Sequence, residues 1–110
     1  MAESRRERIE AMLSEDPTDD FLRYGLALEW IEEGQHERGL GDLRQLMEQE
    51  VPYLPAFPVA GKLLARLGRR SEARAVLRAG IETARRQGEA HAAGEMAEFL
   101  TAMGVPPDPS

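Results

Sequence analysis

The sequence contains no cysteine, few aromatic residues and a single lysine. Without cysteine the chain can form neither disulfides nor thiolate-based sites, and an intracellular setting is favoured. The Arg- and Glu-rich stretch 1–10 is not followed by an apolar run, so it predicts neither a signal peptide nor a membrane span. We therefore expect a cytoplasmic protein that has no membrane partner.

Motifs for catalysis and cofactor binding are also lacking. Gly61 and Lys62 resemble the end of a phosphate-binding loop, but Leu63 stands where that loop needs Ser or Thr. His36 and His91 each lack a second His or Cys at metal-binding spacing, so we expect neither to bind a metal. Glutamates at exposed helix turns, such as Glu32, Glu33, Glu48 and Glu50, are not expected to act as general acids. We predict no enzymatic activity, no cofactor and no metal site.

The charge of the chain is unevenly distributed. Residues 1–55 hold 14 acidic and 6 basic side chains, a net charge of −8, whereas residues 62–86 hold 8 basic and 2 acidic ones, a net charge of +6. Such asymmetry can orient a partner or bring copies of the chain together head to tail. The simpler interpretation, which we favour, is that both regions are solvated helix faces.

The most informative positive feature is a repeat of 34 residues. The pairs separated by this interval are Ala27 and Gly61, Trp30 and Leu64, Gly34 and Gly68, Leu43 and Leu77, and Met47 and Ile81. A fixed period of this length indicates supersecondary units that bury their apolar faces only against their neighbours. The composition, 42% hydrophobic and 31% charged, is that of a folded protein, and 110 residues suffice for one domain. The repeat favours binding over chemistry.

Helix boundaries can be predicted from capping residues, glycines and prolines. Ser4 and Glu7 form a capping box for a first helix, residues 3–15, and Thr18 is expected to cap a second helix that ends at Gly34. A third helix is expected over 35–50. Three prolines then place the start of a fourth helix near 55–58, and Gly68 ends it.

Two further helices complete the chain. Ser71 is expected to cap a fifth helix that ends near Gly88, and a sixth is expected over 89–103. Residues 105–110 are rich in proline, and we expect them to form a disordered tail. Leu77 is expected to be buried between paired helices.

These residues resemble the tetratricopeptide repeat (TPR) family, whose unit is a helix, a turn and a helix in 34 residues. In the family's W-x2-L-G-x2-Y stretch the first repeat reads Arg23, Leu26, Ala27 and Trp30, and the second reads Phe57, Ala60, Gly61 and Leu64. The A-x3-F element reads Gly39 and Leu43, then Ala73 and Leu77. The closing Pro is shifted to Pro52 after the first repeat and is absent after the second, so the fifth helix is expected to run longer than usual.

The resemblance implies an all-α fold, a TPR-like α-α superhelix of about six antiparallel helices. We expect one domain over 1–104, with repeats at about 19–52 and 53–87 and flanking helices at 3–15 and 89–103. The small residues Ala27 and Gly61 are expected where paired helices cross closely.

In TPR proteins the first helix of each repeat lines a concave groove that receives a peptide or helix of another protein. Carried over to this sequence, the resemblance implies a scaffold or protein-interaction module. The expected partner-binding residues are Phe21, Tyr24, Leu28 and Ile31 on the second helix and Lys62 and Arg66 on the fourth.

Two alternatives remain open. The Arg-rich segment 66–86 could bind nucleic acid, although the acidic total charge and the lack of aromatic residues among those arginines argue against it. The groove could instead be closed by a second copy, which would make the chain an obligate homodimer.

Overall fold

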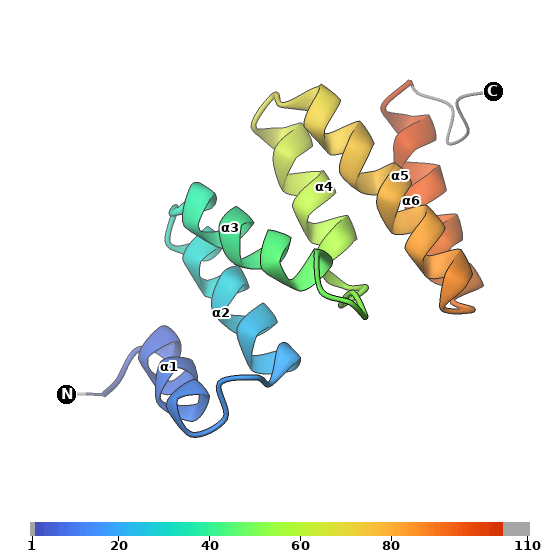
Figure 1. Cartoon of the computed structure of the whole chain (residues 1–110). Helices are drawn as coiled ribbons and strands as arrows, with labels where there is room; N and C mark the ends of the chain where they lie inside the picture. Colours follow the sequence, from blue (N-terminus) through green and yellow to red (C-terminus); the bar gives the residue numbers. More distant parts are fainter. Residues whose placement is uncertain (1, 105–110) are drawn as a thin grey trace. The chain divides into compact units, whose positions relative to one another are not determined.

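The computed structural model describes residues 2–104 and contains six α-helices and no strand in this range (Figure 1). The helices are α1 (Arg5–Glu15), α2 (Asp20–Glu32), α3 (His36–Met47), α4 (Ala56–Arg66), α5 (Arg70–Arg86) and α6 (Ala90–Ala102). The predicted all-α fold is confirmed. The predicted tail, 105–110, lies outside the described residues.

The chain divides into two compact units, one ending at Tyr53 and the other beginning at Leu54. In the first unit α2 packs against both α1 and α3, and in the second α5 packs against both α4 and α6. The single domain over 1–104 and the superhelical stacking of the repeats stay predictions.

Local sequence explains most of the helix ends. Ser4 caps α1 in the predicted capping box, in which its hydroxyl accepts a hydrogen bond from the Glu7 backbone N–H and its own N–H donates to the Glu7 carboxylate. This second bond is the main reason why the pKa of Glu7 is lowered. Gly34 and Gly68 adopt positive φ angles of 84° and 79° and end α2 and α4, as predicted.

Three predicted boundaries are wrong in detail. Asp19, not Thr18, caps α2, because its carboxylate accepts the hydrogen bond from the Leu22 backbone N–H. Ser71 lies inside α5, whose N-cap residue is Arg69 and has no side-chain capping bond. α3 ends at Met47 instead of near residue 50. The 17 residues of α5 exceed the 12 of α3, in keeping with the missing closing Pro of the second repeat.

The core of the first unit lies between α2 and α3. It consists of Ala27, Trp30, Leu40, Leu43 and Leu46, all fully or almost fully buried. A Cβ atom at Gly39 would lie 3.0 Å from the backbone oxygen of Ala27, so the two helices cross closely at small residues. The guanidinium groups of Arg6 and Arg38 lie 4.7 Å and 3.8 Å from the Trp30 ring.

The second unit has the larger core. Buried apolar residues from all three helices form it: Ala56, Phe57, Ala60, Leu63, Leu64, Ala73, Leu77, Ile81, Ala84, Ala93, Met96 and Leu100. Leu77 is completely buried, as predicted. A Cβ atom at Gly61 would lie only 2.6 Å from the Leu77 side chain, which is why the predicted close crossing needs glycine.

Candidate functional site

A groove runs between α4 and α6, which both pack against their common neighbour α5. It contains two adjoining depressions, of about 140 Å³ and about 590 Å³, which share Lys62 and Phe99. We call it the α4–α6 groove, and its lining residues are Pro58, Val59, Lys62, Leu63, Ala65, Arg66, Leu77, Ala92, Glu95, Met96 and Phe99. All of these residues belong to the second unit.

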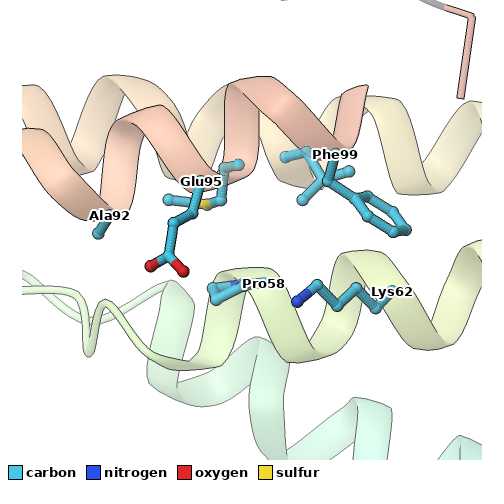
Figure 2. Close-up of a pocket in the computed structure, with 7 residues that line it drawn as sticks. Pro58, Lys62, Ala92, Glu95 and Phe99 are labelled. Atoms are coloured by element: carbon cyan, nitrogen blue, oxygen red, sulfur yellow. The ribbon is translucent and has the colours of Figure 1, made fainter. Parts of the chain in front are cut away.

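The α4–α6 groove combines an apolar lining with charges at its rim. Figure 2 shows Pro58 and Lys62 on α4 facing Ala92, Glu95 and Phe99 on α6. The ammonium group of Lys62 lies 5.7 Å from the centre of the Phe99 ring, within the range of a cation–π interaction. An apolar side chain could occupy this space, and both signs of charge are available beside it.

Lys62 and Arg66, two of the expected partner-binding residues, both line this groove and are exposed. Their role in binding stays a prediction. Sequence analysis did not assign Glu95 and Phe99 to the site. Both residues lie on α6, which follows the 34-residue period only after a shift of two residues. An interval of 36, which relates Leu63 to Phe99 and Gly68 to Gly104, predicts a closing helix after two extra residues, but it does not show which side chains of that helix face α4.

The four expected residues of α2 lie in different surroundings. Phe21 and Leu28 are exposed, with 66% and 37% of their surfaces accessible. Tyr24 is half-buried, with its ring 5.4 Å from that of Tyr53. Ile31 is also half-buried, and its side chain occupies the space beside Gly39 of α3. A common groove formed by these residues with Lys62 and Arg66 stays a prediction.

The surroundings of Tyr24 also change its acidity. Partial burial, together with the nearby Tyr53, raises the pKa of the Tyr24 hydroxyl. The ring is therefore neutral at physiological pH and offers an apolar face with a hydroxyl donor.

A second depression, of about 350 Å³, lies between α1 and α2 in the first unit. Its lining residues are Arg5, Arg8, Ile9, Met12, Phe21, Leu22 and Gly25. Met12 and Phe21 are strongly exposed for apolar residues, at 48% and 66%. Sequence reasoning assigned Phe21 to the partner groove, whereas the structure places it at the edge of this depression.

Several arginines of the 66–86 segment make contacts within the chain. Arg69 forms two hydrogen bonds to Glu72, and Arg86 forms an ion pair with Glu82. Arg70 donates a hydrogen bond to the backbone oxygen of Met103. Within residues 2–104 the close cation–ring contacts involve Arg6, Arg38 and Lys62, none of them on α5. The nucleic-acid alternative therefore gains no support from the arrangement of α5.

Titratable groups in the described part of the chain do not gather into a metal site, since residues 2–104 contain no group of three His, Cys, Asp or Glu side chains suited to one. His91 lies 3.5 Å from Glu95, an exposed pair one helical turn apart. None of the six helices described is both long and apolar enough to cross a membrane. Catalysis, cofactors and membrane partners remain matters of prediction.

Comparison with known proteins identifies the repeat. The chain is 31% identical over 94 residues to the TPR repeat-containing protein PA0015 of Pseudomonas aeruginosa, a match that covers 86% of this chain and 90% of that protein. The solution structure of protein BPP2914 from Bordetella parapertussis superposes with a TM-score of 0.79 at 28% identity, over 94% of this chain and 90% of that one. No family model matches the sequence. With this degree of identity over most of its length, together with the paired helices and the 34-residue period, the chain belongs to the TPR repeat family.

Proposed function

We propose that the chain is a protein-interaction module that binds a peptide or helix of another protein in the α4–α6 groove. TPR proteins typically act as interaction modules, and the relative in Pseudomonas aeruginosa has a name that refers to this repeat. The observation that supports the proposal most strongly is the open apolar depression of about 590 Å³, lined by exposed Lys62 and Arg66. Exposed apolar concavities rimmed by polar groups are typical of interaction sites.

The lining of the groove suggests the chemistry of the bound segment. Val59, Ala65 and Phe99 offer apolar surface for an aliphatic or aromatic anchor residue. Lys62 and Arg66 lie beside that surface and carry positive charge. We therefore expect the bound segment to have a carboxylate close to its anchor residue. The partner segment is therefore expected to combine an apolar anchor with an acidic residue within about one helical turn.

The residues of α2 form a second part of this proposal. Leu28 is exposed, and Tyr24 presents part of its ring, so both remain candidates for contact with a partner. Ile31 is the weakest candidate, because its side chain packs beside Gly39. We also propose that the protein is cytoplasmic and has neither catalytic activity nor a cofactor.

The test is affinity capture from cell lysate with quantitative mass spectrometry. Phe99→Ser and Lys62→Glu should each reduce the recovery of the same captured proteins by about tenfold or more, as loss of a central contact does. Leu67→Ser and Arg85→Glu are matched controls, because both residues are exposed on the same unit and neither lines the groove. Equal losses with the groove variants and the controls would contradict the proposal, provided that circular dichroism shows all four variants folded.

A further inference from the structure

One side of α1 is only partly covered by the first unit. α1 contains no buried residue at all, whereas every other helix contains at least two. Its inner side lies on α2, where Ile9 approaches Gly25 and Arg6 binds Glu33. Arg5, Arg8 and Met12 lie at the edge of the depression that α1 forms with Phe21 and Leu22 of α2, and Met12 is 48% exposed there.

Charges beside this depression are arranged in a specific order along α1. At about 100° per residue, Arg5, Arg8, Met12, Glu15 and Asp16 fall within an arc of about 100°, and we call them the α1 strip. Its basic residues are at the N-terminal end, its apolar residue is near the middle, and its acidic residues are at the C-terminal end. Such an order is complementary to itself when a second helix runs antiparallel to the first.

The charged residues of the α1 strip are also available for new contacts. Within residues 2–104, the side chains of Arg8, Glu15 and Asp16 make no hydrogen bond or ion pair, and all three residues are exposed. Arg5 pairs with Glu29 at 2.8 Å, yet 77% of its side chain remains accessible. Charge complementarity and exposed apolar surface therefore coincide on one face.

We propose that two copies of the chain associate through α1, with the two α1 helices antiparallel about a twofold axis. Arg5 and Arg8 of each copy then lie against Glu15 and Asp16 of the second copy. Met12 and Phe21 of one copy cover the depression of about 350 Å³ on the other. Because the same strip serves both copies, this interface closes and does not extend into a filament. None of these residues lines the α4–α6 groove, so the proposal does not depend on the function assigned to that groove.

Two charge reversals test the arrangement without weakening the helix. Arg8→Glu places an acidic residue near the N-terminus of α1, and Glu15→Lys places a basic residue at its C-terminus, both of which suit the helix dipole. Each variant alone sets like charges against each other at both ends of the twofold interface. Each should weaken self-association by about tenfold or more. When the two variants are mixed in equal amounts, opposite charges face each other again at both ends, and the mixture should associate as tightly as the original chain.

Sedimentation equilibrium at several concentrations and physiological ionic strength provides the measurement. The expected result is a dimer for the original chain, weaker association for each variant alone and a heterodimer for the mixture. Arg86→Glu, a charge reversal at an exposed position on α5, and Phe99→Ser in the groove should leave the dimer unchanged. A monomer at all concentrations would overturn the proposal and assign the α1 strip to a different protein. A dimer that Phe99→Ser disrupts, while the two α1 variants do not, would overturn it in favour of the groove.

Discussion

The two terminal helices are held in their respective units by different contacts. α6 buries Ala93, Met96 and Leu100 against its unit, and a Cβ atom at Gly80 of α5 would lie 2.6 Å from the Met96 sulfur. α1 buries no residue and is joined to α2 largely through arginine. Arg5 binds Glu29 and Arg6 binds Glu33, each at 2.8 Å.

The difference shows which of the two terminal helices is more strongly stabilised by contacts within its unit. Apolar burial contributes roughly 25 cal/mol for each Å² removed from water, whereas exposed ion pairs contribute little and are screened by salt. α6 is therefore an integral part of its unit, and the groove that it forms with α4 has a rigid wall. α1 buries fewer residues than α6, and its exposed Met12 beside the α1–α2 depression is available for contact with another molecule.

The largest effect is expected at the centre of the second unit. Leu77→Ala should cost about 2 to 5 kcal/mol of unfolding free energy, because the leucine is completely buried and fits against Gly61. Urea denaturation measures this loss, and Leu67→Ala, at a partly exposed leucine, should cost much less. A Leu77→Ala variant that melts within about a degree of the parent would contradict the assigned packing.

A pair of glycine substitutions probes how α6 is attached. Gly80→Ala should destabilise by about 1 to 3 kcal/mol, because its methyl group would lie 2.6 Å from the Met96 sulfur and 2.7 Å from Phe57 Cβ. Gly94→Ala, within α6 and with open space around it, should instead stabilise by up to about 1 kcal/mol. Thermal denaturation of the two variants measures these changes in stability. Equal shifts of the melting temperature in the same direction would mean that the tight α5–α6 contact is absent.

A smaller and more local effect is expected at α1. Arg6→Gln removes the pairs with Glu10 and Glu33 and the contact with the Trp30 ring, while the α2–α3 core remains. Hydrogen exchange of the α1 amides should therefore accelerate, and added salt should accelerate it in the original chain as well. The amides of α6 serve as the control and should be insensitive to salt. Protection of α1 that is unaffected by both salt and the substitution would show that its apolar contacts suffice.

The smallest effect concerns Asp42 on α3, beside Arg23, Leu26 and Gln45. Partial burial raises its pKa above the ordinary value of 3.8, although Arg38 and Arg23 partly oppose this. Because the folded-state pKa of Asp42 lies above the unfolded-state value of 3.8, ionisation of Asp42 lowers the stability of the folded chain. This cost is fully present above the folded-state pKa and disappears below about 3.8. Asp42→Asn should therefore raise the melting temperature slightly at pH 7 and leave it unchanged at pH 3. A shift of the same size at both values would exclude ionisation as the cause.

Much of the fold could be predicted because the relevant signals are local. The capping box of Ser4 and Glu7, the helix-ending Gly34 and Gly68, and the 34-residue period each follow from backbone geometry or helix pairing within one repeat. The caps of α2 and α5 were assigned to Thr18 and Ser71, because neighbouring polar residues compete for the same role and sequence alone does not decide between them.

The candidate site was harder to predict because it depends on contacts between distant segments. Lys62 and Arg66 could be assigned to a groove from the resemblance, whereas Phe99 and Glu95 line it from α6, which follows α4 at an interval of 36 instead of 34 residues. Phe21 is assigned to the groove by the resemblance to TPR proteins, and this resemblance does not show that Phe21 borders a depression between α1 and α2.

Site-specific photocrosslinking in cells tests the central claim, that the α4–α6 groove binds another protein, most directly. Benzoylphenylalanine at position 99 preserves an aromatic ring at the wall of the groove, and the same residue at position 86, exposed on α5, is the control. We predict that illumination links position 99 to a distinct protein partner, that Lys62→Glu abolishes this adduct, and that position 86 gives none. The claim would be contradicted if position 99 gave no adduct, or if the adducts at the two positions were the same.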